Sequence, residues 1–210
     1  DMCLQGCVSN NQDLEGAGVM IANGVTARLN KVLIRSCHSV RAGGGGIFVS
    51  GSDLTLEDVQ VENCGGHESA VQVAGGSGTL VWNGGKLNGN RAESSALNLK
   101  GALSVTSGSS SNVIISNVKF EQNHIAVVIE DGSPALSLSF QSCIFQHNRP
   151  QIASHYTINL RPAERAAFES CNFANNTGEG GGGGGHVHAR GPVRPPLVEL
   201  MVFGSQNARS

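Results

Sequence analysis

The chain has 210 residues, of which 39% are hydrophobic and only 14% are charged, a balance that excludes both a disordered chain and a tight helical bundle. The net charge of -2 and the pI of about 6.4 give no basic stripe and no acidic tail, so nucleic acid is not an expected partner. No run approaches the roughly 18 apolar residues of a transmembrane helix.

A repeat of about 26 residues runs along the sequence. Each copy ends on asparagine or cysteine, three residues after an apolar or aromatic residue in most copies. In chain order these end positions are Asn10, Cys37, Cys64, Asn90, Asn123, Asn148 and Asn176, with spacings of 27, 27, 26, 33, 25 and 28. Together with 29 glycines and no helical periodicity, this regularity predicts an all-β solenoid.

Apolar residues recur in fixed register before each end position, at ten, eight, five and three residues back. The steps of two, three and two predict a strand, a corner residue and a second strand. The row eight residues back is expected to form one buried stack of Leu29, Leu56, Trp82, Ile115, Phe140 and Phe168. The row five residues back contains Val32, Val59, Gly85, Val118, Cys143 and Cys171.

A third strand is predicted after the variable turn of most coils, at residues 19–21, 47–49, 71–73, 97–99 and 127–129. The sequence therefore predicts a right-handed, single-stranded parallel β-helix of about six to seven coils, with three strands per coil, over residues 1–178. The extra residues of the 33-residue spacing are assigned to a Ser/Gly bulge at residues 104–111. Shortening this bulge is expected to cost little stability.

The end positions are expected to stack into a ladder of inward amides that bond neighbouring backbone. Cys37 and Cys64 would occupy this ladder as small, mostly apolar substitutes. Free buried thiols are expected for these two residues and for Cys143 and Cys171, because parallel Cβ vectors one coil apart suit a disulfide poorly. A local bridge between Cys3 and Cys7 is the alternative at the start of the chain.

The tail departs from the repeat. Residues 179–196 contain a hexaglycine run and several prolines, which predict a flexible insertion or linker. Residues 197–210 are expected to return as a final strand or a cap.

The endings of the form Phe-x-x-Asn, together with Gly44-Gly45-Gly46-Ile47, resemble the repeat of the chlamydial polymorphic outer-membrane proteins. More broadly, the coils are similar to the pectin-lyase-like β-helix superfamily. The resemblance covers roughly residues 7–178. It implies a surface or secreted rod and carries no catalytic residue with it.

The strongest candidate for a catalytic or calcium site is the acidic cluster of Asp53, Glu57, Asp58 and Glu62. Under a pectate-lyase-like alternative, Asp53 and Asp58 would act with Lys31 or Arg35 on an acidic polysaccharide, with calcium as cofactor. The favoured interpretation is that Lys31 and Arg35 make ordinary surface ion pairs with the acids of the next coil. It includes no catalytic residue and no cofactor.

The turns after the end positions carry polar residues that either bind a partner or simply solvate loops. The candidate binding residues are His38, Arg41, His67, Arg91, His124 and Arg149. No metal site is expected, because His186 and His188 have no carboxylate or thiol nearby in sequence. Asn175 opens a glycosylation sequon. Phe48, Tyr156 and Phe203 are the aromatic side chains expected to be exposed.

The sequence therefore favours a non-catalytic extracellular or cell-surface module, a rigid spacer or adhesion segment of a larger protein. Its expected partners are a protein or glycan surface and the rest of the parent chain. Because the first seven residues lack the basic start and apolar run of a signal peptide, the targeting signal is expected outside these residues.

Overall fold

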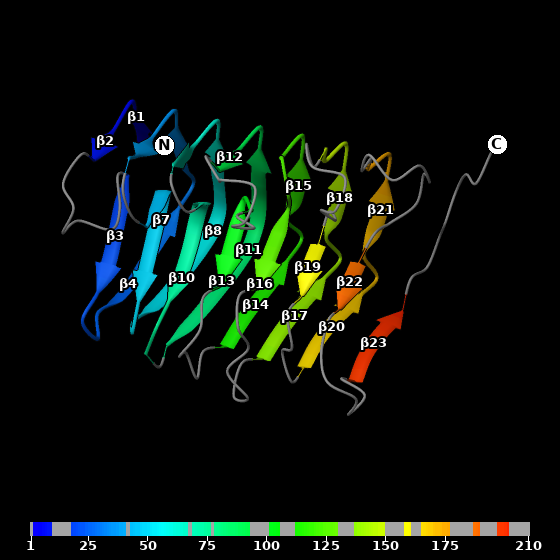
Figure 1. The fold of residues 1–210 in the computed structure, drawn as a ribbon. Helices are drawn as coiled ribbons and strands as arrows, with labels where there is room; N and C mark the ends of the chain where they lie inside the picture. Colours follow the sequence, from blue (N-terminus) through cyan, green and yellow to red (C-terminus); the bar gives the residue numbers. More distant parts are fainter. Residues whose placement is uncertain are drawn as a thin grey trace.

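In the computed structural model the chain folds as a parallel β-solenoid, whose strands follow one another as rungs along the molecule (Figure 1). The structure describes residues 2–9, 18–40, 43–66, 69–76, 78–92, 101–105, 112–129, 137–149, 158–160, 165–176, 187–189 and 197–201. Within these ranges all regular elements are strands, every strand pairing is parallel, and no helix could span a membrane.

Three sheets run along the solenoid. The first has 12 strands: β1 (Met2–Gln5), β4 (Thr26–Asn30), β5 (Val32–Arg35), β8 (Asp53–Glu62), β11 (Thr79–Asn88), β14 (Asn112–Ser116), β15 (Lys119–Glu121), β17 (Ser137–Gln141), β18 (Ile144–Gln146), β20 (Arg165–Glu169), β21 (Asn172–Ala174) and β23 (Leu197–Met201). The second has seven: β3 (Val19–Ala22), β7 (Gly44–Ser50), β10 (Ser69–Ala74), β13 (Leu103–Val105), β16 (Val127–Ile129), β19 (Ile158–Leu160) and β22 (Val187–Ala189). The third has four: β2 (Val8–Ser9), β6 (His38–Ser39), β9 (Gly65–Gly66) and β12 (Arg91–Ala92).

The predicted fold class is confirmed, but the coil differs in two details. The two predicted strands before each end position belong to one sheet, and they merge into ten-residue strands in β8 and β11. The third face of the coil is a two-residue strand just after the end position, where the sequence indicated only a turn. Among the described residues all three sheets occur together in about four coils, whereas six to seven coils with three strands each were expected.

A left-handed backbone residue bends each coil at the predicted corner. Asp58 has a φ of 49° in the middle of β8, and the same position is left-handed in the neighbouring coils. The members of this corner row are Lys31, Asp58, Gly84, Asn117, Ser142 and Ser170. A second left-handed row comes just before the end positions, so two tight corners per coil leave the residues between them extended.

The inward rows form the core in the predicted register. The stack eight residues back from the end positions is confirmed by the pairings of Leu29 with Leu56, Leu56 with Trp82, Trp82 with Ile115, Ile115 with Phe140, and Phe140 with Phe168. All but the half-buried Leu29 are fully buried. Phenyl rings continue the stacking beside it, with the centroids of Phe120 and Phe145 4.7 Å apart.

The prediction for the long fourth spacing was wrong. The strand of the second sheet is β13, whose Leu103 pairs with Val71, and not residues 97–99. Ser104 is fully buried in this strand, so the segment assigned to a surface bulge begins inside the sheet. Leu103 lies 13 residues after Asn90, whereas Val71 lies 7 after Cys64, so most of the extra length precedes β13.

Two further expectations change. Val8 pairs with His38, which puts Cys7 rather than Asn10 in register with Cys37. Phe48 is 2% exposed and therefore offers no exposed aromatic surface, while Tyr156 and Phe203 lie outside the described residues. In the tail, β22 lies within residues 179–196 and pairs with β19, and β23 pairs with β20.

Candidate functional site

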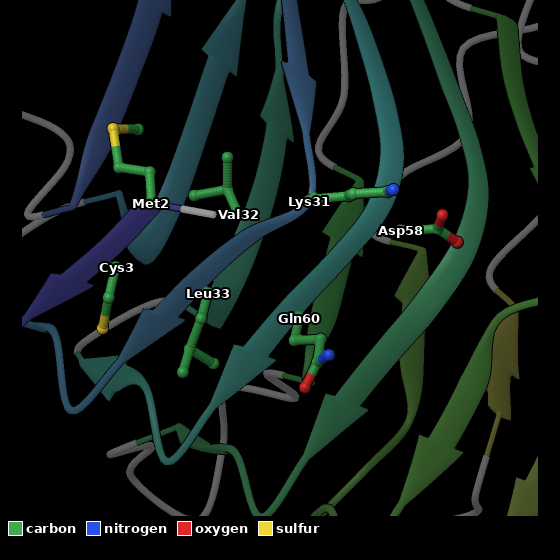
Figure 2. Close-up of a pocket in the computed structure, with 7 residues that line it drawn as sticks. All are labelled: Met2, Cys3, Lys31, Val32, Leu33, Asp58 and Gln60. Carbon is green, nitrogen blue, oxygen red and sulfur yellow. The ribbon is translucent and has the colours of Figure 1, made fainter.

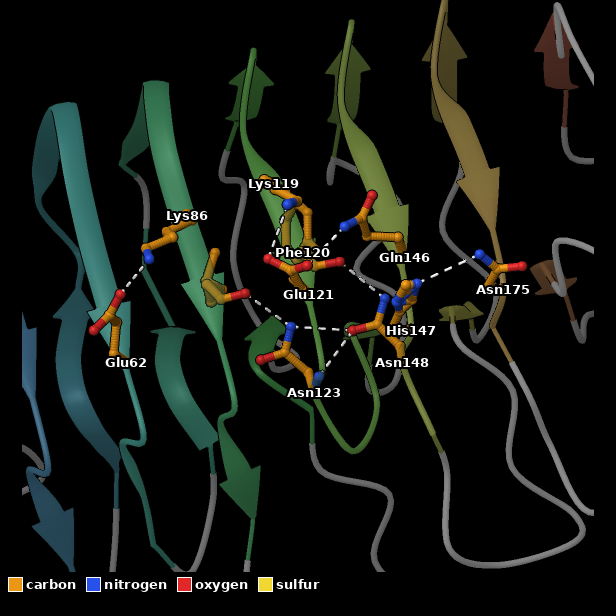
Figure 3. A network of polar contacts seen from close by, with 11 residues as sticks. Glu62, Lys86, Lys119, Phe120, Glu121, Asn123, Gln146, His147, Asn148 and Asn175 are labelled. Carbon is orange, nitrogen blue, oxygen red and sulfur yellow. Dashed lines mark hydrogen bonds and ion pairs between the residues drawn. The ribbon is translucent and has the colours of Figure 1, made fainter.

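A buried ladder of asparagine side chains runs through four successive coils at the end positions: Asn90, Asn123, Asn148 and Asn176. Figure 3 shows the two middle members, Asn123 and Asn148. Asn123 illustrates the pattern. Its Nδ2 donates to Leu87 O at 3.0 Å and to Asn148 Oδ1 at 3.1 Å, and its Oδ1 accepts from the backbone N and the Nδ2 of Asn90. Every hydrogen-bonding position of this amide is therefore used. The predicted ladder is present.

Cys64 and Cys37 continue the ladder toward the N-terminus. The backbone N of Cys64 donates to Asn90 Oδ1 at 2.9 Å, and the backbone N of Cys37 donates to Cys64 Sγ at 3.4 Å. All six cysteines are free thiols, so the alternative bridge between Cys3 and Cys7 is not formed. The adjacent Cys64 thiol, followed by burial, raises the pKa of the Cys37 thiol.

A row of basic residues lies directly after the ladder. The backbone N of Arg91 donates to Cys64 O, that of His124 to Asn90 O, and that of Arg149 to Asn123 O, at 2.9 to 3.2 Å. Arg91, His124 and Arg149 therefore occupy equivalent positions in three successive coils, and we call them the basic row. The same register passes back through Gly65 to His38 in the third sheet.

The basic row contains three of the six predicted binding residues and a fourth, His38, lies two coils earlier in the same register. Arg41 and His67 lie outside the described residues. Arg91 and Arg149 are exposed, whereas His124 between them is partly buried. The sequence places these residues in loops, but their position one residue after each end position was a signal that they stack.

Burial, followed by the positive charge of Arg91, lowers the pKa of His124. We expect Arg91→Gln to raise this pKa, without restoring the ordinary value because burial is the larger cause. A titration of the His124 ring by NMR measures the change, and Arg28→Gln on another face serves as the control. An unchanged pKa in Arg91→Gln would show that the guanidinium does not lie beside this ring.

The residues of the lyase alternative do not converge on one point. Lys31 and Asp58 line a surface pocket of about 420 Å³ at the corner row, together with Met2, Cys3, Val32, Leu33 and Gln60 (Figure 2). Asp53 and Arg35 do not line it. Asp53 lies five residues before Asp58 on β8, about 16 Å along an extended strand, so the two carboxylates cannot share one ion.

Most of the predicted acidic cluster bonds to the neighbouring coils. Asp53 Oδ1 accepts from the backbone N of Thr79 at 2.8 Å. Glu57 pairs with Arg28 at 2.7 Å, and Glu62 pairs with Lys86. The expected pairs of Lys31 with Asp58 and of Arg35 with Glu62 are not formed among the described residues. Arg35 donates to Gln5 Oε1, and no bond joins Lys31 to Asp58 among the described residues.

The remaining residues that the sequence singled out are the glycosylation candidate Asn175 and the two histidines of the tail, for which no metal site was expected. Asn175 is exposed, and its Nδ2 lies 3.4 Å from His147 Nε2 (Figure 3). In the described ranges no three His, Cys, Asp or Glu side chains gather as metal ligands. His188 lies in β22, and His186 is outside the described residues.

The chain matches a known family over most of its length. The family described as "Right handed beta helix region" matches residues 3–153. No curated protein and no solved structure matches significantly. With more than half of its residues matched and a parallel solenoid as its fold, the chain belongs to the family of right-handed β-helix regions.

Proposed function

We propose that this chain is a non-catalytic β-helix module, which serves a larger cell-surface or extracellular protein as a rigid spacer and binding scaffold. The hydrogen bonds and ion pairs of the acidic side chains support this proposal most directly. Asp53, Glu57, Glu62 and Glu121 each bond a neighbouring coil or a neighbour on the same strand, and they do not gather around a common point. Carboxylates used in this way stabilise the stack of coils and are poorly placed for acid–base chemistry.

Continuity of the stack supports the spacer role. The first sheet is paired without interruption from β1 to β23, and the buried amide ladder adds bonds along the same axis. Each rung is bonded to the rungs on both sides, which resists bending and stretching. The resemblance of the repeat to surface-protein repeats supports the extracellular location.

A turnover assay with the 210-residue chain tests the proposal against the lyase alternative. Polygalacturonate is incubated with the protein, with and without calcium, and chain cleavage is followed as new reducing ends and as ultraviolet absorbance of unsaturated products. We expect no turnover above the buffer rate under either condition. Turnover that Asp58→Ala abolishes and Glu57→Ala retains would instead assign an active site to the corner pocket.

A further inference from the structure

Three cysteine side chains are stacked at the end positions of successive coils, and we call them the thiol column: Cys7, Cys37 and Cys64. The residues that directly follow them, Val8, His38 and Gly65, are paired in register in the third sheet. The column therefore continues the amide ladder, whose next member, Asn90, accepts a hydrogen bond from the backbone of the last cysteine. Sulfur takes the place of the amide group in these three coils.

The backbone holds the three sulfur atoms of the column in place. Cys7 O accepts from the backbone N of His38 at 2.8 Å, and Cys37 O accepts from that of Gly65 at 3.1 Å. The backbone N of Cys37 also donates to Cys64 Sγ at 3.4 Å. Cys37 and Cys64 are at most 1% exposed, whereas Cys7 is half-buried. The thiols are therefore fixed before any ligand arrives, and the column is accessible from outside at Cys7.

The spacing of the column suits a bridging metal ion better than a disulfide. Neighbouring rungs of a parallel sheet lie about 4.8 Å apart, and equivalent side chains on them run parallel. A disulfide requires a sulfur–sulfur bond of about 2.05 Å and Cβ atoms about 3.8 Å apart, so the rungs would have to move. Two metal–thiolate bonds of about 2.3 Å in line span about 4.6 Å, close to the separation of the rungs. A two-coordinate ion therefore fits between neighbouring sulfurs with little movement of the backbone.

The donor atoms of the column select the kind of ion. Cys37 interacts with a thiol on each side, and within the described ranges no three His, Cys, Asp or Glu side chains gather as metal ligands. Zinc takes about four such ligands, and calcium takes about six to eight oxygen atoms. Thiolates prefer soft ions such as Cu(I), which accepts two sulfur ligands in linear geometry. The column therefore matches Cu(I) and neither of the harder cations.

We infer that the thiol column binds one soft monovalent cation of the Cu(I) type, in line between Cys37 and a neighbouring thiol of the column. This inference goes beyond the proposed function and does not depend on it. Binding breaks two S–H bonds, forms two sulfur–metal bonds and releases two protons, with no change of oxidation state. The resulting site carries one net negative charge. Where Cys64 is the second ligand, the hydrogen bond from the backbone N of Cys37 stabilises that charge.

A matched set of variants isolates the column. Cys143 and Cys171 form a second stack of thiols, so the background chain carries Cys143→Val and Cys171→Val, valine being the usual residue of that row. In this background, Cys37→Ser removes the sulfur that both neighbouring pairs share. Cys37→Asn removes it with the residue that the amide ladder uses at this position, and circular dichroism checks the fold of both variants. Cys3→Ser, at an exposed cysteine outside the column, is the control (Figure 2).

Each form of the chain is titrated with Cu(I) without oxygen, in competition with a coloured Cu(I) chelator, and separately with Zn²⁺. We expect the background chain and Cys3→Ser to bind one Cu(I) ion, and both Cys37 variants to bind it about a hundredfold more weakly or worse. X-ray absorption of the loaded background chain should show two sulfur neighbours and no nitrogen or oxygen neighbour. Zn²⁺ should bind the background chain far more weakly than Cu(I).

The inference is overturned if the background chain does not bind Cu(I), if the folded Cys37 variants bind it as tightly as the background, or if Cys3→Ser weakens binding equally. A nitrogen or oxygen neighbour of the bound ion, or equally tight binding of Zn²⁺, would also contradict it. Each of these results would leave the non-catalytic module intact, because that proposal is tested by turnover of polygalacturonate.

Discussion

Replacing Asn123 by leucine is expected to lower the free energy of unfolding by about 4 kcal/mol or more. Leucine has the same number of side-chain heavy atoms but no polar atom, so it would leave the backbone N and Nδ2 of Asn90 and the carbonyl of Leu87 without their partner at a buried position. Urea unfolding followed by circular dichroism measures the change. The substitution would interrupt the amide ladder in the middle of the stack.

Two other variants separate the hydrogen bonds from general effects of substitution. Asn123→Cys should cost about 2 kcal/mol, because a thiol at this slot can accept from the preceding backbone, as Cys64 Sγ does from Cys37. Asn172→Leu, at an exposed position of β21, should change stability by no more than about 0.5 kcal/mol. Equal losses in Asn123→Leu and Asn123→Cys would show that a hydrogen-bond acceptor at this position does not contribute to stability.

Gly85→Val is expected to destabilise the fold by about 3 kcal/mol or more, although valine is the usual residue of this inward row. Gly85 has a φ of +101°, and a Cβ there would lie 2.0 Å from the carbonyl oxygen of Val59. The indole of Trp82 is fully buried nearby, and its Nε1 donates to Gly84 O at 2.9 Å. Backbone conformation and contact both exclude the larger residue.

Gly6→Ala separates these two causes. Gly6 has a similar left-handed φ of +67°, but a Cβ there would meet nothing within 4 Å, so we expect a loss of only about 1 kcal/mol from conformation alone. Thermal and urea unfolding of both variants provide the comparison. A Gly85→Val protein as stable as the wild type would mean that this corner adopts the geometry of its neighbours.

The register of the core could be predicted because burial repeats with the coil. A row such as Leu56, Trp82 and Ile115 has no alternative inward position, since a shift of one residue would turn charged neighbours such as Glu57 inward. The amide ladder could be predicted in the same way, because the end positions lie a constant number of residues after these rows in every coil. The fold class and the core residues could therefore be predicted from the spacing of the repeat.

The predictions that were wrong concern segments whose local pattern fits two different strand assignments. Residues 97–99 and 103–105 both alternate apolar and polar, and only pairing with Val71 selects the second set. The third sheet was missed because strands of two residues, such as Gly65–Gly66 in β9, have no composition typical of strands. Its pairing is imposed by the neighbouring coils.

The candidate site was predictable as a set of residues and not as an arrangement. Arg91, His124 and Arg149 could be identified as polar residues after the end positions, but their common line depends on the third sheet and its continuation. Side-chain partners were less predictable still. Arg35 lies in register with both Gln5 and Glu62 on the neighbouring coils. Its side-chain rotamer decides that it bonds Gln5, and the sequence alone does not determine this rotamer.

The uniform bonding of the amide ladder also has an evolutionary consequence. Each coil presents the same donors and acceptors to the next, whether the period is the 25 residues that end at Asn148 or the 28 that end at Asn176. If one whole period were duplicated or lost, the two coils brought together would still present matching donors and acceptors to each other, whatever the number of residues in that period. A rod of this design can therefore lengthen or shorten by whole coils of about 4.8 Å each, and insertions confined to a turn leave the ladder in place.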